Sequence, residues 1–378
     1  MMEEIDLPDD WKICTLREMF DFQKKSKHKA GEGKEKGDYK FFTSSNIQSK
    51  FIDDFDFEGE HLIFATGGHA GIHYCGDKFS ASTDCFILKN TKKIVQKYVY
   101  YYLFGNIHLV EAGFKGAGLK HISKAYLQNI EIPLPPLPVQ KKIADMLEKA
   151  EKLKMWRKEA DKLTDEFLKS TFLEMFGDPV KNPMGWEIKK LREFGTVITG
   201  NTPSRKNSNY YGDYIEWIKS DNINTPHTYL TKSEENLSKD GSEVGRIVPK
   251  GAVLVTCIAG SLSCIGNVAI ADRKVAFNQQ INAIIPNKMI NEFFLYHLIL
   301  NSRTLIQNYS TQSMKGMVSK SIFQSIPLIF PSIELQNNFG SLAEKVEHMR
   351  QYQQESKAHI DDLFNVLMQK AFKGELVA

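Results

Sequence analysis

The sequence predicts an α+β fold in which two mixed α/β domains are joined by two long helices packed as an antiparallel coiled coil, with an internal pseudo-two-fold repeat. Three observations predict this fold. Two long helix-compatible stretches each follow a proline-rich segment. Each of these stretches comes after a block of globular composition, and the two halves of the chain can be aligned with each other. The expected order is therefore domain, helix, domain, helix.

Residues 1–137 form the first predicted domain. Short runs of β-branched and aromatic residues between glycine turns are typical of strands. They occur at 39–47, 62–66 and 85–88. Residues 95–103 predict a helix that packs on one face of the sheet, although their tyrosines would suit a strand equally well. The lysine- and glycine-rich residues 23–39 have no periodicity, which predicts a surface loop.

Residues 138–177 form the first long helix, which we interpret as a spacer. Prolines just before it favour an extended backbone, because proline lacks an amide donor and restricts its predecessor. Apolar residues recur in steps of three and four, which predicts one buried stripe. The stripe consists of Ile143, Leu147, Ala150, Leu153, Trp156, Ala160, Leu163 and Phe167. Gly177 and Pro179 predict the end of the helix. Its length would be roughly 60 Å at 1.5 Å per residue.

The second half repeats this plan, with a domain at residues 178–332 and a spacer helix at 333–378. Around the helices a constant offset of 196 aligns the halves, so that Gln140 matches Gln336 and Phe176 matches Phe372. We align Thr83-Asp84-Cys85 with Asn278-Gln279-Gln280. Two similar helices related in this way can pack as an antiparallel pair.

Composition and charge exclude several classes of protein. Lysine and arginine exceed the acidic residues by only three (49 − 46), so no global basic charge indicates nucleic acid. Residues 178–332 are nevertheless net basic, with 17 basic and 12 acidic groups. Five cysteines without a CxxC pair predict reduced thiols and a cytoplasmic location. No apolar run approaches the ~20 residues that span a bilayer, so we expect no membrane association.

Catalytic and metal-binding motifs are weak throughout the chain. The glycine-rich residues 113–120 lack the lysine and hydroxyl residue of a phosphate-binding loop. Residues 182–185 (NPMG) differ from the Asn-Pro-Pro-aromatic motif of adenine methyltransferases. His69, His73, Cys75 and Cys85 do not match the spacing of a structural zinc site. We therefore expect no catalytic residues, no bound metal and no cofactor in this chain.

Basic and polar loops recur at matching places in both predicted domains. Lysine and arginine neutralise phosphates, whereas Asn, Gln, Arg and His can read base edges. A single such loop is more often a solvated surface, but the recurrence in both halves favours binding to double-stranded DNA. In the first domain the candidate DNA-binding residues are Lys24, Lys25, Lys27, Lys29, His69, His73, Tyr74, Lys78, Lys115 and Lys120. In the second they are Thr202, Ser204, Arg205, Lys206, Tyr210, Tyr211, Arg273, Asn278, Gln279 and Lys315.

The order of several short motifs resembles the specificity subunits of Type I restriction-modification systems over essentially the whole chain. The motifs are Gly185-Trp186 with Leu191, Gly200-x-Thr202-Pro203-Ser204, Tyr211-x-Gly212, Trp217-Ile218, and Ser220-Asp221-Asn222-Ile223. The proline-led helix starts at 132–144 and 326–340 and the helix ends FLEMFGDP and LMQKAFKGEL add to them. Residues 1–137 depart from the commoner pattern, because lysines replace the Gly-x-Thr-Pro-Ser loop before Tyr39.

The resemblance implies a non-catalytic subunit with two target-recognition domains, each reading half of a bipartite DNA site. It implies that the helices set an unread spacer and that methyltransferase (modification) subunits, possibly two, dock on them. The cofactor S-adenosylmethionine would then be bound by the methyltransferase subunit, and a separate restriction and translocation subunit would cut unmodified DNA.

Two alternatives remain open from the residues alone. A coiled-coil scaffold that binds proteins and not DNA would use the same helices, and Met155, Trp156, Met349 and Tyr352 are typical interface anchors. A nuclease or methyltransferase with an unrecognised site would instead show activity as the isolated chain. Salt-insensitive association without a DNA footprint would favour the scaffold.

Overall fold

The computed structural model describes residues 8–311 and 316–376. The chain divides into two compact units. Unit 1 comprises Met1–Arg157 and Glu355–Ala378, and unit 2 comprises Lys158–Gln354. Each long helix therefore contributes one half to each unit. Among the described residues, no helix is long and apolar enough to cross a membrane.

Unit 1 contains two small sheets and a layer of helices. The first sheet has the order β2-β8-β5-β6, formed by Phe20–Phe22, Cys85–Asn90, His61–Ala65 and Ile72–Cys75. The second has the order β4-β3-β7, formed by Lys50–Ile52, Tyr39–Phe42 and Phe79–Ala81. Strands β1 (Lys12–Thr15) and β11 (Glu131–Leu134) pair with each other, as do β9 (Phe114–Lys115) and β10 (His121–Ile122). The helices are α1 (Leu16–Met19), α2 (Gln96–Gly105), α3 (His108–Glu111) and α4 (Lys124–Gln128).

Strand β5 separates two hydrophobic cores because its side chains alternate between the faces of the sheet. Leu62 and Phe64 pack in the core beneath the helices. Ile63 packs on the opposite face, in the core that includes Phe42 and Phe79. Unit 1 is therefore built in three layers, and residues 96–105 are a helix, not the alternative strand.

Unit 2 has the same three layers with longer connections. One sheet has the order β13-β21-β17-β19, formed by Gly195–Thr199, Ile281–Pro286, Val253–Thr256 and Val268–Ile270. The other has the order β15-β14-β20-β16, formed by Asn236–Leu237, Tyr211–Ile218, Val275–Phe277 and Ile247–Val248. Strands β12 (Ile188–Lys190) and β23 (Pro327–Ile329) pair, as do β18 (Ile258–Ala259) and β22 (Gly316–Met317). The helices are α6 (Lys239–Val244), α7 (Glu292–Asn301), α8 (Arg303–Asn308) and α9 (Lys320–Ser325).

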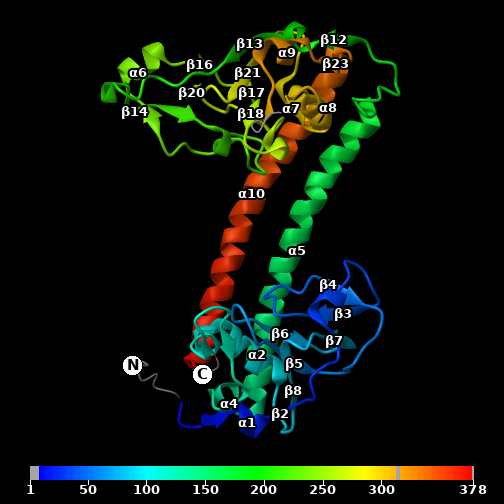
Figure 1. The fold of residues 1–378 in the computed structure, drawn as a ribbon, viewed down its shortest axis with the longest axis vertical. Helices are drawn as coiled ribbons and strands as arrows, with labels where there is room; N and C mark the ends of the chain where they lie inside the picture. The colour runs from blue at the N-terminus through cyan, green and yellow to red at the C-terminus, as the bar shows by residue number, and fades with distance from the viewer. Residues whose placement is uncertain (1–7, 312–315, 377–378) are drawn as a thin grey trace. The chain divides into compact units, whose positions relative to one another are not determined.

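Within unit 2, the sheet that contains β17 and β21 lies between the helices α7 and α8 and the smaller sheet with β14 and β20 (Figure 1). Val253 and Val255 face the helices, and Leu254 faces the other sheet. The alternation is thus the same as in β5 of unit 1. This agreement confirms the internal repeat at the level of individual strands.

Equivalent backbone hydrogen bonds fix the alignment of the two units. The N–H of Thr66 donates to the carbonyl of Asp84 (3.0 Å), and the N–H of Cys257 donates to that of Gln280 (2.8 Å). Cys85 pairs with Ala65 as Ile281 pairs with Thr256. Asp84 is therefore equivalent to Gln280 at an offset of 196. The alignment of residues 83–85 with 278–280 is wrong by one position, because a short polar run contains no period that sets its register.

Helices α5 (Leu137–Phe176) and α10 (Ile333–Phe372) each have 40 residues, which confirms both long helices. The side chain of Gln140 accepts a hydrogen bond from the Val95 N–H (2.9 Å) and donates to the Pro135 carbonyl (2.7 Å). Gln336 makes the equivalent bonds with Asn291 (3.1 Å) and Pro331 (2.9 Å). Each buried glutamine thus fastens the start of a long helix to the turn before α2 or α7.

The end of α5 also follows the prediction. Gly177 has a φ of +74°, and its N–H donates to the carbonyl of Leu173 (2.9 Å). A side chain is strained in this conformation, so glycine suits the helix cap.

The two helices pack against each other within each unit. In unit 2, Thr164 lies level with Gln353 and Phe172 lies level with Phe339, so the helix segments run antiparallel. In unit 1, Lys154 forms an ion pair with Asp361 (2.9 Å).

The predicted apolar stripe of α5 is only partly buried. Ile143, Leu147 and Ala150 lie in the core of unit 1. The later members Leu153, Trp156, Leu163 and Phe167 are exposed, and Thr164, Leu168, Phe172 and Phe176 are buried instead. Apolar residues at steps of three and four can be drawn along either of two neighbouring faces of this helix. The periodicity of the sequence therefore did not show which of the two faces is buried.

Candidate nucleic-acid interface

Several loops of unit 1 meet at one end of its sheet, and we name them the edge loops of unit 1. They are residues 26–29, 43–46, 66–73, 82–84 and 115–122. The Gly68 N–H donates to the carbonyl of Lys120 (3.0 Å), and the Thr83 N–H donates to that of His28 (2.8 Å). The imidazole of His73 lies 2.8 Å from the Ser45 carbonyl oxygen. Backbone contacts therefore join segments that are far apart in the sequence.

Six candidate residues of unit 1 belong to this edge. They are Lys27, Lys29, His69, His73, Lys115 and Lys120. All of them except His73 are exposed. Burial lowers the pKa of His73 below its ordinary value, so this ring is neutral at physiological pH. None of the four lysines forms a close ion pair with a carboxylate among the described residues. The edge thus offers four exposed lysines outside ion pairs and one half-buried histidine, together with the exposed Asp84.

Of the other candidates of unit 1, Lys24 and Lys25 directly precede the edge loops, whereas Tyr74 and Lys78 lie away from them. Lys78 occupies the turn between β6 and β7, at the opposite end of the sheet, 4.0 Å from the Glu58 carboxylate. The hydroxyl of Tyr74 donates to Glu60 (2.5 Å). Lys24 and Lys25 are exposed after β2, and the ammonium of Lys25 lies 5.4 Å from the centre of the Phe86 ring. The structure therefore does not bring Tyr74 or Lys78 to the edge loops.

Unit 2 has matching edge loops, which are residues 200–206, 219–224, 257–266, 278–280 and 316–318. The Asn201 N–H donates to the Phe277 carbonyl (3.1 Å), and the Val318 N–H donates to that of Cys257 (2.8 Å). The second of these bonds is equivalent to the bond from the Ile122 N–H to the Thr66 carbonyl (3.1 Å) in unit 1. The two edges are thus formed by equivalent segments of the repeat.

Most candidate residues of unit 2 lie on or beside this edge. The Thr202 hydroxyl donates to the side-chain oxygen of Gln279, which is exposed. Ser204 and Lys206 are also exposed. Asn278 is buried, and its side-chain amide donates to Gln280 (3.1 Å), so it shapes the loop from within. Lys315 lies outside the described residues.

Arg205 is held by an ion pair and two aromatic rings. Its guanidinium donates to both carboxylate oxygens of Glu235, with 2.9 Å for the Nη2 to Oε2 bond. The guanidinium carbon lies 4.3 Å from the centre of the Tyr211 ring and 5.2 Å from that of Trp217. The bond from Arg205, followed by that from Lys219 (2.7 Å), lowers the pKa of Glu235 to about 2. We name these five residues the arginine clamp.

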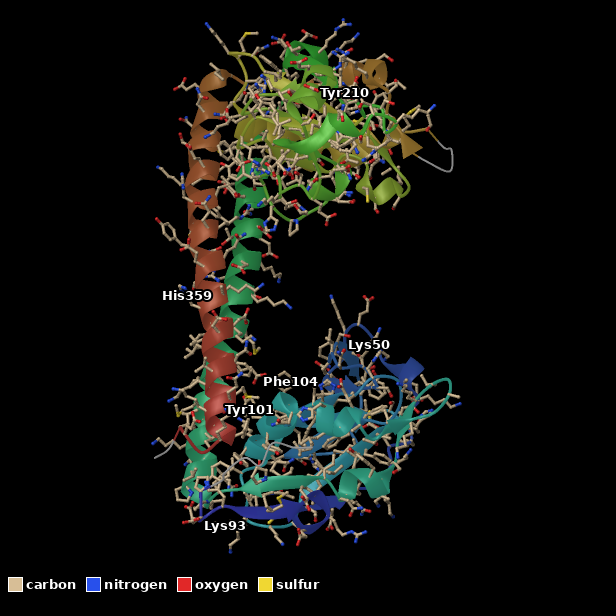
Figure 2. All side chains as sticks on the ribbon, turned by 90° about the vertical axis from the view of Figure 1, so that its left-hand side faces the viewer. Lys50, Lys93, Tyr101, Phe104, Tyr210 and His359 are labelled. Carbon is tan, nitrogen blue, oxygen red and sulfur yellow. The ribbon has the colours of Figure 1, made fainter. Side chains whose placement is uncertain are left out.

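Arg273 and Tyr210 are the remaining candidate DNA-binding residues of unit 2. Arg273 lies between β19 and β20, at the end of the sheet opposite to the edge loops. Its guanidinium donates to Glu216, to Asp272 (2.5 Å) and to the carbonyl of Thr231 (3.1 Å). Tyr210 ends a 3-10 turn just before β14, and its carbonyl accepts from the Ser238 N–H (3.0 Å) (Figure 2). Arg273 therefore braces the smaller sheet away from the edge.

Sequence reasoning missed Lys219, Glu235 and Gln280. The hydroxyl of Ser220 donates to the side chain of Gln280 (3.3 Å), so both belong to the edge. Ser220 and Ser44 match in the repeat, which was a usable signal for the neighbouring residues. Glu235 carried no such signal, because a carboxylate in a polar loop is normally solvated.

Large apolar side chains are exposed on the long helices within each unit. In unit 1, Met155 and Trp156 of α5 are 65% and 67% exposed. In unit 2, Met349 and Tyr352 of α10 are 44% and 73% exposed. Isolated apolar side chains are normal on surfaces, but large aromatic residues and methionine are typical of protein interfaces. These four residues do not belong to the buried helix contact.

Among residues 8–311 and 316–376, no group of three histidine, cysteine, aspartate or glutamate side chains could hold a metal ion. Cys75, Cys85 and Cys257 are buried thiols, and burial raises their pKa values above the ordinary one, to about 11 for Cys85 and about 12 for Cys257. Protonated thiols of this kind are poor nucleophiles.

Comparison with known proteins gives consistent results. The specificity subunit of the Type I restriction enzyme HindI of Haemophilus influenzae is 28% identical over 205 residues, and the match covers 51% of this chain and 42% of that protein. The MjaVIII specificity subunit of Methanocaldococcus jannaschii is 21% identical over 412 residues, covering 99% of this chain and 95% of that protein. The chain thus spans less than half of the Haemophilus relative and almost all of the MjaVIII subunit.

A solved structure has the same fold. The crystal structure of the Type-I restriction-modification system S subunit from M. genitalium superposes with a TM-score of 0.69 at 14% identity, covering 98% of each chain. A family model, described as the Type I restriction modification DNA specificity domain, matches residues 8–163 and 183–372. This match includes both units and most of the chain, so the chain belongs to the family of Type I restriction-modification specificity subunits.

Proposed function

We propose that this chain is the DNA-recognition subunit of a Type I restriction-modification complex. Each unit reads one half of a bipartite site in double-stranded DNA through its edge loops. Helices α5 and α10 set the length of the unread spacer. In this proposal residues 1–137 and 178–332 are the two target-recognition domains, and residues 138–177 and 333–378 are the spacer helices.

The repeated edge is the observation that carries this proposal. Equivalent segments meet at one end of the sheet in both units. In unit 1 they present the exposed lysines Lys27, Lys29, Lys115 and Lys120, and in unit 2 they present exposed polar side chains such as Thr202 and Gln279 beside Lys206. Phosphate contacts position a protein on DNA, and side-chain amides and hydroxyls can read base edges. A duplicated reader suits a site with two separate halves, as dimeric DNA-binding proteins suit two half-sites.

Methyltransferase subunits are the proposed partners of the long helices. The exposed Met155 and Trp156 in unit 1 and the exposed Met349 and Tyr352 in unit 2 supply the large anchors that such an interface requires. We propose that S-adenosylmethionine is bound by these partner subunits and that this chain does not catalyse methylation. A restriction and translocation subunit would join the same complex.

Mapping of methylated sites tests the proposal. Cells that carry this chain with its modification subunit should methylate one bipartite sequence. Exchange of residues 1–137 for those of a related subunit should change one half-site and leave the other half-site and the spacer unchanged. A purified complex that binds all sequences with equal affinity at physiological salt would contradict DNA recognition, and salt-insensitive binding to proteins alone would favour a scaffold.

A further inference from the structure

The arginine clamp joins two of the edge loops of unit 2, because Arg205 and Lys219 belong to them and both bond Glu235. It consists of Arg205, Tyr211, Trp217, Lys219 and Glu235, and the question is whether Arg205 contacts DNA or holds the loop that does. Its two terminal nitrogens are both bonded to Glu235. A phosphate that approached Arg205 would meet this carboxylate, and a bidentate pair leaves fewer donors for a second anion.

The loop before Arg205 is fixed at Asn201 and Pro203 by members of the clamp and by Val244. The indole N–H of Trp217 donates to the Asn201 carbonyl (3.2 Å), and the hydroxyl of Tyr211 donates to the Pro203 carbonyl (2.7 Å). The side chain of Asn201 also bonds the carbonyl of Val244 (2.9 Å). The two rings that hold the loop are those on which the Arg205 guanidinium is stacked.

Unit 1 contains a comparable arrangement at the equivalent place. Phe42 pairs with Ala81 as Ile218 pairs with Phe277, so Phe41 is equivalent to Trp217. The His28 ring lies edge-on to Phe41, with 6.2 Å between the ring centres, and its Nδ1 lies 2.8 Å from Glu32. The Lys29 N–H donates to the same carboxylate (2.7 Å). In both units a basic side chain, an aromatic ring and a carboxylate hold a loop of the edge.

We propose that Arg205 and Glu235 are positioning residues for DNA recognition, which fix residues 201–204 so that Thr202 and Gln279 meet the bases of one half-site. This inference rests on the proposed function. Lys206, which is exposed and has no carboxylate partner among the described residues, supplies the phosphate contact beside the clamp.

Two measurements on the full chain test this inference. The first is hydrogen exchange of the free chain, which does not depend on DNA recognition. Arg205→Ala and Glu235→Gln should both speed the exchange of amides in residues 201–205, with the rest of unit 2 unchanged. The second variant keeps the shape of the side chain, so it protects the test against simple misfolding. If the amides of residues 201–205 exchange at the wild-type rate in both variants, the proposal that Arg205 and Glu235 fix this loop is wrong.

The second measurement is DNA binding by the chain with its modification subunits at several salt concentrations. Both variants should reduce discrimination against single-base changes in the half-site of unit 2 by about tenfold, comparable to one mismatched base pair. The salt slope and the other half-site should not change. The control Lys206→Ala should reduce the salt slope by about 0.9 without a change in discrimination.

A direct phosphate contact by Arg205 predicts different effects of the two substitutions on DNA affinity and on the salt slope. If Arg205 contacts phosphate and Glu235 only restrains it, Glu235→Gln should tighten binding and Arg205→Ala should reduce the salt slope, and this pattern would overturn the inference. A wild-type complex without sequence preference, combined with faster exchange in both variants, would contradict DNA recognition and leave the clamp supported as a device that orders the loop.

Discussion

Arg350 forms an ion pair with Asp165 in unit 2, and the repeat maps this pair onto Lys154 and Asp361 in unit 1. The two pairs lie in different surroundings. Arg350 also donates to Glu347, which is 7% exposed, and to the Thr228 hydroxyl (3.2 Å). Lys154 forms its ion pair with Asp361, which is partly exposed, and its ammonium group lies over the Phe364 ring. Equivalent positions of the repeat thus carry a partly buried network around Arg350 in one unit and a more exposed pair in the other.

Replacement of Arg350 by alanine should therefore destabilise the protein more than the equivalent replacement of Lys154. Arg350→Ala leaves the carboxylate of Glu347 buried without its cation, which costs about 3 kcal/mol. Lys154→Ala removes a partly exposed pair worth at most about 1 kcal/mol. Urea unfolding of both variants measures the difference in free energy of unfolding. Equal losses would show that the burial of Glu347 does not matter.

Lysines of the edge loops should contribute to the salt dependence of DNA binding. Lys120→Ala removes one uncompensated charge from the edge of unit 1, so affinity should fall for all sequences and the salt slope should decrease by about 0.9. Lys78→Ala is the matched control, because Lys78 lies at the opposite end of the same sheet beside Glu58. Binding titrations at several salt concentrations give both slopes. A larger effect of Lys78 would place the DNA at the other end of unit 1.

His297 should make unit 2 sensitive to acid. Its side chain is 4% exposed, it stacks with Phe172, and it lines a cavity of ≈ 670 Å³. Burial, and to a smaller extent the charge of Arg350, lowers its pKa from 6.5 to about 3. Between these values the unfolded chain binds one more proton than the folded chain, so stability falls as the pH falls below 6.5.

At pH 5 this histidine should cost about 2 kcal/mol relative to neutral pH. His297→Phe should remove that part of the pH dependence, and His359→Phe is an exposed control on α10 (Figure 2). Urea unfolding at pH 7 and pH 5 gives the change in the free energy of unfolding for the wild type and for each of the two variants. Identical pH dependence in the wild type and in His297→Phe would contradict a neutral buried imidazole.

Four residues added to each long helix should lengthen the spacer of the recognised site. Insertions after Lys162 in α5 and after Gln354 in α10 add about one helical turn, or ~6 Å, to each helix. At about 3.4 Å per base pair the unread spacer should grow by about two base pairs, with both half-sites unchanged. A four-residue insertion after Lys181, beyond the end of α5, is the control and should leave the spacer as it was. Methylation mapping measures each spacer, and an unchanged one in the helix variant would contradict the spacer role.

Local patterns predicted much of this fold. Prolines before the helices, Gly177 after the first of them and the duplicated glutamines Gln140 and Gln336 are features of the chain itself, so both ends of α5 and the start of α10 could be placed within one residue. The end of α10 was predicted at residue 378, whereas the helix ends at Phe372. Strand runs such as 62–66 were found because β-branched and aromatic residues cluster between glycines. The exposure of Trp156 could not be predicted, because it depends on which face of α5 meets α10 in the fold.

The candidate site was predicted less completely. The segments with lysines and glycines do meet at the edges, but Lys78, Tyr74 and Arg273 lie away from them. Charge in a loop is visible in the sequence, whereas the end of the sheet on which the loop lies depends on strand direction and pairing.

The sequence by itself determined the duplicated order of domains and helices and the kinds of residue in each loop, because composition and periodicity are local properties. Only the tertiary structure decided which charges remain uncompensated. Arg205 and Glu235 are 30 residues apart, and backbone pairing between distant strands joins them beside Trp217. The same pairing leaves Lys120 without a carboxylate among the described residues. Contacts of this kind depend on the whole fold, since each requires two segments that the chain alone does not bring together.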